Sequence, residues 1–243
     1  MSLQLANPRT SSTIYKIPQK IFDLYYYLER KFLNKKKWTE MHEKSLWYEL
    51  CFCILSSNIL YEQAQSATKY LAERNFLDPQ WVIEDNNSQQ TLAYELSKPA
   101  YLPNKKDGSF SKYRFPNVRA KNIVESAKYI YSKKSGLKQI LLDAKTETDA
   151  RDTIVRHIFG MGLKESSHFL RNIGYSSNLA IIDVHIISFL RYMKLENNTG
   201  KNITPRKYYE LENKMREVAG FYGLNLSILD NAIWHYVKST ELT

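Results

Sequence analysis

Apolar residues recur every three or four positions along most of the chain, the spacing that buries one face of an α-helix. The run between residues 46 and 60 is apolar almost all round, which indicates a helix at the centre of a core. The alternation of apolar and polar residues that is typical of strands is weak throughout. The pattern predicts helices over 21–32, 46–60, 63–74, 92–97, 118–131, 151–159, 164–173, 184–193, 205–219 and 226–237.

Residues that break helices are scarce. Eight Gly and seven Pro make 15 of 243 residues, which is about half of the roughly 12% that is usual. A chain of this length buries about 70% of its unfolded surface, so it needs no disulfide or metal ion to hold a core. We therefore predict an all-α fold, in which two packed helical subdomains with a cleft between them form a single domain over residues 1–243.

Positive charge is concentrated in one part of the chain. The net charge is +10, and residues 98–138 hold eleven Lys and Arg against only Asp107 and Glu125. Such a cluster is typical of a surface that binds a polyanion. We interpret 98–138 as a basic segment that faces DNA, the alternative being a basic face that only solvent contacts.

The ends of the chain and its apolar runs argue against a membrane protein. Residues 1–13 are polar, unlike the apolar centre of a signal peptide. The longest apolar run, 50–55, is far shorter than the ~20 residues that span a bilayer. We expect a soluble, cytoplasmic protein with no membrane partner.

The sharpest local signal is a helix, a Gly160-Met-Gly162 turn and a second helix, over residues 151–173. Two glycines spaced in this way permit a tight turn with positive φ. Free backbone N–H groups at the start of the second helix would then bind a phosphate. The alternative is an ordinary turn between two helices, with glycine as a C-cap. We expect this helix-hairpin-helix motif beside the cleft.

Two residues near this motif are candidates for chemistry. Lys164 lies in the first turn of the second helix, where the helix dipole disfavours a cation, and this placement suits a nucleophilic amine. Asp183 follows the apolar run 179–182 and stands where an N-cap is expected. Taken alone, Lys164 is equally a phosphate contact or a solvated lysine, and Asp183 is equally a helix cap and nothing more.

These residues resemble a known family. The stretch Gly160-Met-Gly-Leu-Lys164-Glu-Ser-Ser-His-Phe-Leu-Arg-Asn-Ile-Gly174, followed by Leu179-Ala-Ile-Ile-Asp183, is similar to the helix-hairpin-helix glycosylases. Within them it looks like the archaeal second type of 8-oxoguanine DNA glycosylase/lyase. The stretches 49–58, 113–123 and 229–234 support the resemblance, which runs from about residue 20 to the end of the chain.

The resemblance implies excision of a damaged base, 8-oxoguanine, from duplex DNA. The damaged nucleotide must be flipped out of the stack before any side chain reaches it. Lys164 would attack C1′ of the deoxyribose, expel the base and form a Schiff base that permits strand cleavage by β-elimination. Asp183 would stabilise the positive charge that develops on the sugar.

The same resemblance implies further contacts with DNA. Gly160, Gly162 and His185 would hold the DNA backbone. Phe115 and Trp234 would stack on the flipped base, and Asn58 would fill the vacated stack or read the opposite cytosine. For the aromatic pair the alternative role is core packing, and for His185 and Asn58 it is a polar position at a helix end.

The chain departs from the family at two places. Ile182 precedes Asp183, where the wider superfamily has glycine or proline. The family typically ends in a lysine that helps to recognise the oxidised base, whereas this chain ends in Thr243. We place Thr243 among the base-binding residues. We expect the ratio of 8-oxoguanine excision to guanine excision to be smaller than in relatives that end in lysine.

Partners and cofactors follow from the same interpretation. We expect a monomer that acts on double-stranded DNA containing a damaged base and associates with the nucleoid. No cofactor or metal centre is expected, since the histidines show no metal-ligand spacing, apart from a monovalent cation of the kind found at such hairpins. The alternatives are a DNA-binding helix-hairpin-helix module without catalysis, and a glycosylase for a different damaged base.

Overall fold

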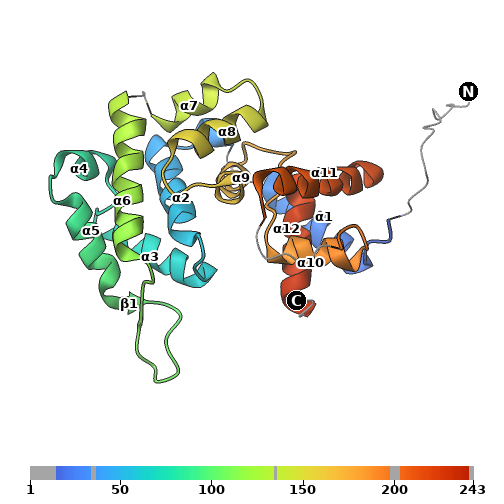
Figure 1. The fold of residues 1–243 in the computed structure, drawn as a ribbon, viewed down its shortest axis with the longest axis horizontal. Helices are drawn as coiled ribbons and strands as arrows, with labels where there is room; N and C mark the ends of the chain where they lie inside the picture. The colour runs from blue at the N-terminus through green and yellow to red at the C-terminus, as the bar shows by residue number, and fades with distance from the viewer. Residues whose placement is uncertain (1–14, 34–36, 134–135, 198–202, 241–243) are drawn as a thin grey trace, which may run out of the picture.

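Helices make up nearly all of the regular structure. The computed structural model describes residues 15–33, 37–133, 136–197 and 203–240 (Figure 1). The first half contains α1 (Gln19–Leu33), the 3₁₀ turn η1 (Trp38–Glu40), α2 (Glu43–Ser56), α3 (Tyr61–Glu73), α4 (Pro79–Glu84), α5 (Ser88–Ser97), β1 (Pro99–Tyr101), β2 (Ser111–Lys112), α6 (Pro116–Ala127) and the π-helical η2 (Lys128–Lys133). The second half contains α7 (Leu137–Asp143), α8 (Glu147–His157), α9 (Leu163–Asn172), α10 (Val184–Tyr192), α11 (Pro205–Tyr222) and α12 (Leu226–Thr240).

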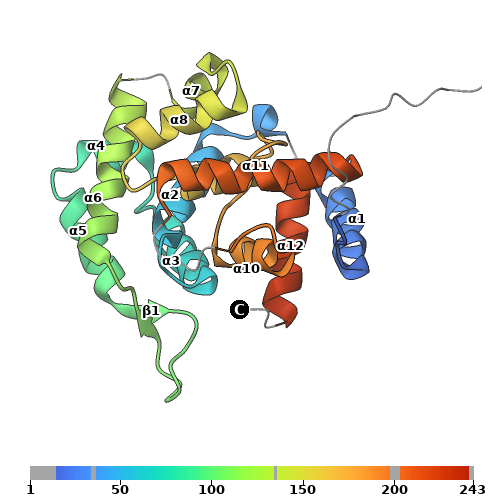
Figure 2. The same ribbon diagram turned by 45° about the vertical axis from the view of Figure 1, so that its right-hand side comes forward.

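The helices enclose two separate hydrophobic cores, as predicted. The first core takes its buried residues from Leu46 to Leu179, and α2 runs through its centre (Figure 1). The second core joins α1 to α10, α11 and α12, so that the first and last helices of the described residues, α1 and α12, lie side by side (Figure 2). Between the two cores lies α9, the second helix of the predicted hairpin motif.

Helix α2, which contains most of the apolar run predicted over 46–60, is central because other elements cover both of its faces. Eight of the fourteen residues of α2 are buried, and the indole of Trp47 donates a hydrogen bond of 2.8 Å to the carbonyl of Leu77. The helix ends at Ser56 rather than at residue 60. The reason is local, since Asn58 has a φ of +57°, which no right-handed helix accommodates.

Several short elements were not predicted. They are α4, α7 and the hairpin of β1 and β2, which pair antiparallel. The helix predicted over 118–131 begins at Pro116 as α6, and its apolar residue Val118 is 55% exposed. No helix in the part of the chain that the structure describes has both the length and the apolar character needed to cross a membrane.

Candidate active site

The predicted hairpin motif is present as α8, a tight turn and α9. Gly160 has a φ of +78°, and a Cβ at this position would collide with the side chain of Asn122. Gly162 is the N-cap of α9 with a φ of −90°, so only one of the two glycines requires the left-handed region. The backbone N–H of Phe159 donates to the hydroxyl of Ser126 at 3.1 Å, which fixes the turn against α6.

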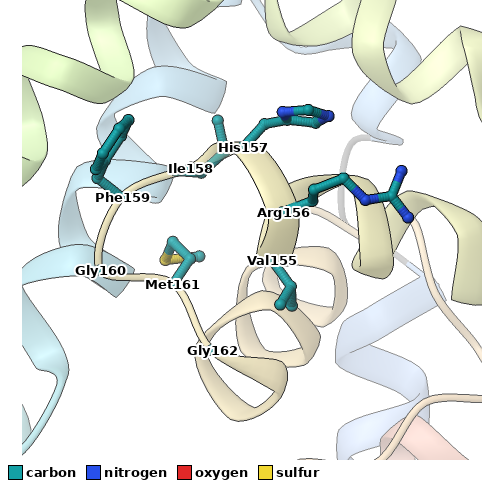
Figure 3. A pocket seen from close by; sticks show the side chains of 8 residues that line it. All are labelled: Val155, Arg156, His157, Ile158, Phe159, Gly160, Met161 and Gly162. Atoms are coloured by element: carbon teal, nitrogen blue, oxygen red, sulfur yellow. The ribbon is translucent and has the colours of Figure 1, made fainter.

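The turn surrounds a hollow of about 370 Å³ lined by residues 155–162. Figure 3 shows the side chain of Met161 inside the curve of this turn. Because the N-cap of α9 is a glycine, no side chain caps the first N–H groups of that helix. Those N–H groups remain available for a phosphate oxygen.

The described residues contain no group of three or more His, Cys, Asp or Glu side chains that could hold a metal ion. A cation at the hairpin would therefore have to rely on backbone carbonyl oxygens, and it stays a prediction.

Lys164 occupies the first turn of α9, as expected. Its side chain is half-buried, and within the described residues its ammonium forms no ion pair and no hydrogen bond. Lysines of structural importance are normally paired when they are partly buried. An ion pair or hydrogen bond within the described residues therefore does not account for this amine, and its role as a nucleophile stays a prediction.

Asp183 caps α10, which confirms the prediction of an N-cap. Its Oδ1 accepts hydrogen bonds from the N–H groups of His185 at 2.9 Å and Ile186 at 3.0 Å. Both bonds end on Oδ1, so Oδ2 has no hydrogen-bond donor among the residues that the structure describes. The cap and the predicted electrostatic role are compatible, because each uses a different oxygen.

The apolar run that leads to Asp183 forms no strand, and buried side chains satisfy its backbone instead. The N–H of Ala180 donates to Glu212 at 3.1 Å. Glu212 in turn pairs with Arg151 at 2.5 Å, and both side chains are almost completely buried. Because Arg151 belongs to α8, this ion pair connects the first helix of the hairpin to the segment before Asp183.

A second connection runs from α9 itself. The hydroxyl of Tyr208 lies 3.3 Å from that of Ser167, donates to the carbonyl of Ala180 at 2.8 Å and accepts from the N–H of Ile182 at 3.3 Å. Ser167 stands three residues after Lys164 on the same helix. Tyr208 therefore connects the helix that carries Lys164 to the residue directly before Asp183.

A third connection passes through α12. Asp230 accepts from Arg171 of α9 at 2.7 Å and from the N–H of Ile181 at 3.3 Å. Complete burial raises the pKa of Asp230 to about 7 in spite of Arg171, and the negative charge of nearby Asp183 adds to the rise. The three connections hold the start of α10 in a fixed position relative to α9.

Two histidines lie close to the candidate catalytic residues. His168 follows Lys164 by one turn, and burial lowers its pKa to about 3, with Arg171 and Lys164 adding to the effect. Its imidazole is therefore neutral. The Nδ1 atom of His185 is buried and has no hydrogen-bond partner among the described residues, so a polar partner from outside the chain would satisfy it.

Trp234 lies beside this group. The edge of His185 meets its ring at a centroid distance of 5.7 Å, and the ammonium of Lys238 lies 4.7 Å from the ring centroid. Lys238 also pairs with Glu62 of α3 at 3.4 Å, which joins the second core to the first. The indole is half-buried, so part of it remains available for stacking.

Phe115 and Asn58 lie outside the buried part of the first core, in the segments next to α6 and α2, and one arginine contacts both segments. Phe115 precedes α6 and is flanked by the guanidinium groups of Arg114 and Arg119, at 4.9 and 5.9 Å from its ring centroid. Arg119 also donates to the carbonyl of Ser57 at 2.6 Å. Asn58 is exposed at the end of α2. The last candidate, Thr243, lies outside the described residues.

The basic segment 98–138 does not form one surface. Arg119 is only 7% exposed and binds backbone and an aromatic ring, so it is not a free phosphate contact. Lys105, Lys106 and Lys112 are exposed on the hairpin of β1 and β2. Lys138 lies on α7, at the opposite end of the first core in Figure 1, and donates to the carbonyl of Thr39.

Sequence reasoning did not identify the buried polar residues that position Asp183. The sequence nevertheless contains an indication of these residues, because Asp230 and Glu212 interrupt helix faces that are otherwise apolar. A buried carboxylate requires a partner. The partners, however, are separated from them by 32 to 61 residues, and spacing along the chain does not show which groups meet.

Comparison with known proteins agrees with this geometry. Residues 29–224 match the model of the Ogg-HhH family, described as 8-oxoguanine DNA glycosylase. The chain belongs to this family. It is 32% identical to the 8-oxoguanine DNA glycosylase/AP lyase of Thermoplasma volcanium, over 88% of this chain and 91% of that one. The enzyme of the same name from Metallosphaera sedula is 35% identical, with 86% and 88% covered.

A solved structure is also similar to this member of the Ogg-HhH family. It is the Methanocaldococcus jannaschii 8-oxoguanine glycosylase/lyase in complex with a 15mer DNA containing 8-oxoguanine. The two share 28% sequence identity, with a TM-score of 0.72 over 91% of this chain and 97% of that one. The predicted fold class and family are confirmed.

Proposed function

We propose that this protein excises 8-oxoguanine from duplex DNA and then cleaves the strand at the abasic site. Membership of the Ogg-HhH family, together with the names of its relatives, supports this activity. The observation that carries the residue assignment is the unpaired, half-buried amine of Lys164 at the start of α9. The start of α9 is linked through buried side chains to the start of α10, where Asp183 has a free Oδ2.

The reaction proceeds in two steps on these residues. The neutral amine of Lys164 forms a bond to C1′ while the glycosidic bond to the base breaks, and the base leaves with the bonding electron pair and takes up a proton. The side chain of Asp183 stabilises the positive charge on the sugar in the transition state. The nitrogen of Lys164 then loses a proton and forms a double bond to C1′ while the C1′–O4′ bond breaks and O4′ takes up a proton, which opens the sugar ring and gives the Schiff base. The Schiff base permits loss of a C2′ proton and cleavage of the C3′–O bond, after which water releases the enzyme.

The flipped nucleotide is held by groups around this pair. The first N–H groups of α9 and the orphaned Nδ1 of His185 bind the DNA backbone. Trp234 and Phe115 stack on the base, a contact worth about 1–3 kcal/mol per base in stacking platforms. Thr243, which lies outside the described residues, stays a predicted base-binding residue. The protein acts as a monomer.

Borohydride trapping tests this function. The wild-type protein is incubated with duplexes that contain 8-oxoguanine, another oxidised purine, uracil, an abasic site or only normal bases. Borohydride reduces the Schiff base to a stable amine, so the protein becomes covalently attached to the 8-oxoguanine and abasic duplexes. Lys164→Gln abolishes trapping and cleavage but retains binding, whereas Lys145→Gln, at an exposed lysine before α8, traps as the wild type does.

Each alternative has its own outcome in this experiment. Trapping that persists in Lys164→Gln would mean that another amine is the nucleophile. Binding without trapping by the wild type on every duplex would indicate a DNA-binding module without catalysis. Trapping on another lesion, with none on 8-oxoguanine, would replace the substrate assignment.

A further inference from the structure

The hairpin of β1 and β2 extends away from the first core. The two strands pair antiparallel, with Pro99 opposite Lys112 and Tyr101 opposite Ser111. Every residue from 102 to 110 is exposed. The loop protrudes from the helices in both views (Figures 1 and 2). The loop of residues 102–110 adds no buried side chain to either core, so its role is to be sought outside the protein.

The base of this hairpin is firmly attached to the first core. Tyr101 is fully buried, and its hydroxyl donates to the carbonyl of Glu95 at 2.6 Å. The N–H of Leu102 donates to the hydroxyl of Ser66 at 3.1 Å, and a Gln63 side chain donates to the carbonyl of Lys112 at 3.1 Å. Both strands are therefore fixed to α3.

The protruding loop is also braced internally. The N–H of Lys105 donates to the carbonyl of Ser109 at 2.8 Å, and the side chain of Asn104 donates to the carbonyl of Gly108 at 2.9 Å. Asp107 accepts from both the N–H and the hydroxyl of Ser109. A braced loop loses little conformational entropy when it binds, which favours a role in recognition.

The chemistry of the hairpin fits one partner. Lys105, Lys106 and Lys112 are exposed, and the single acidic residue of the loop, Asp107, is satisfied by its own turn. Phe110, the last residue of the loop before β2, is 49% exposed. Lysines that meet phosphates, together with an apolar side chain that enters a groove, are a common combination in proteins that bind duplex DNA.

We propose that the hairpin, residues 99–112, is an arm that grips the duplex on one side of the flipped nucleotide. This inference rests on the proposed function. The chain passes directly from β2 through Arg114 to Phe115, so the arm begins at the site for the base. The five residue-to-residue steps from Tyr101 to Lys106 reach at most about 17 Å, which corresponds to about five base pairs of the flanking duplex.

The test compares affinities over a range of salt concentrations. The first probe is a duplex with an abasic-site analogue and about twelve base pairs on each side of it. In each of two further duplexes, the base pairs on one side of the analogue are reduced to about three. The variants are Lys105→Gln/Lys106→Gln and Phe110→Ala. The matched control, Lys20→Gln/Lys145→Gln, removes the same charge at two exposed lysines elsewhere.

We expect the hairpin double variant to reduce the slope of log affinity against log salt by about 1.8, since each phosphate contact contributes about 0.9. When one of the two flanking segments of the duplex is trimmed, the double variant and the wild type have the same salt slope. When the other flanking segment is trimmed, the difference between their slopes remains. Phe110→Ala weakens binding about four- to twelvefold at every salt concentration, the value of burying the exposed half of a phenylalanine. The control variant keeps the wild-type slope.

A wild-type slope in the hairpin double variant would overturn the proposal, and so would an equal loss of slope in the control, which would show a general effect of charge. The proposal would also be overturned if the variants differed from the wild type by the same amount on all three duplexes. Failure of the proposed function is distinguishable, because it appears as absence of trapping by the wild-type protein. The salt slopes of the hairpin variants are measured independently on binding alone.

Discussion

The buried ion pair between Arg151 and Glu212 yields the strongest prediction about the active site. Glu212→Gln keeps the size of the side chain but removes its charge. One of the two carboxylate oxygens is replaced by an NH₂ group, which is a donor. This group then faces either the guanidinium of Arg151 or the N–H of Ala180, and both of these are donors too. Arg151, whose Nε already lacks a partner, is left as an uncompensated buried charge.

The magnitude follows from this geometry. The side chains of Arg151 and Glu212 are 1% and 3% exposed, and removal of one member of such a pair costs about 3–5 kcal/mol. In a protein of this size each kcal/mol lowers the Tm by about 2–4 °C, so the expected decrease is about 6–20 °C. Glu210→Gln, on the same helix, disrupts a pair whose members are 91% and 45% exposed and costs about 0.5 kcal/mol or less.

The assay combines thermal unfolding with single-turnover excision, both measured on Glu212→Gln and on the Glu210→Gln control. A third protein, Arg151→Met/Glu212→Met, replaces the pair with apolar side chains. It recovers most of the stability, because no charge is left buried. Its excision remains slow, because Ala180 has lost the acceptor that holds the segment before Asp183.

Two results would refute this reasoning. Equal unfolding midpoints for Glu212→Gln and Glu210→Gln would show that burial does not govern the energy of the pair. Recovery of both stability and excision in the double methionine variant would show that the pair stabilises the fold but does not position Asp183.

Three further predictions concern the site and its surroundings. Asp183→Asn retains the cap of α10, so the Tm changes little while single-turnover base release slows by orders of magnitude; an unstable variant with a normal rate would mean that Asp183 serves only as a cap. His168 titrates near 6.5 when unfolded and near 3 when folded, so the unfolded state takes up the proton first and stability falls as the pH decreases below 6.5. The loss is at most about 1.4 kcal/mol per pH unit, and the slope becomes shallower in His168→Gln if the imidazole is its source. Thr243→Lys widens the ratio of excision of 8-oxoguanine to that of guanine by about ten- to a hundredfold, and an unchanged ratio would exclude a role for the tail.

Features determined by neighbouring residues were predictable from the sequence. Asp183 is an N-cap because its own side chain reaches N–H groups two and three residues ahead. The turn at Gly160 follows from its positive φ. Both depend on interactions within one turn of helix, which residue type and spacing describe directly.

Features determined by distant residues were not predictable. Arg119 belonged to a basic segment and looked like a phosphate contact, but the carbonyl of Ser57, 62 positions away, binds it in the first core. The spacing around Val118 fits more than one helix face, and the packing of α6 leaves this residue exposed. The β1–β2 hairpin was missed because its strands are only three and two residues long.

The composition of the two cores has a consequence for synthesis of the protein. The first core is built from one continuous stretch, so it can form while the ribosome is still adding residues. In contrast, α1 emerges first, and its buried face at Ile21 and Tyr25 waits for partners from residues 180–237. A nascent chain whose synthesis stops after the first core, near residue 179, therefore contains the β1–β2 hairpin and Lys164 but lacks Asp183. Asp183, for which we propose a role in excision, takes its place at the start of α10 only once the helices that complete the second core have left the ribosome.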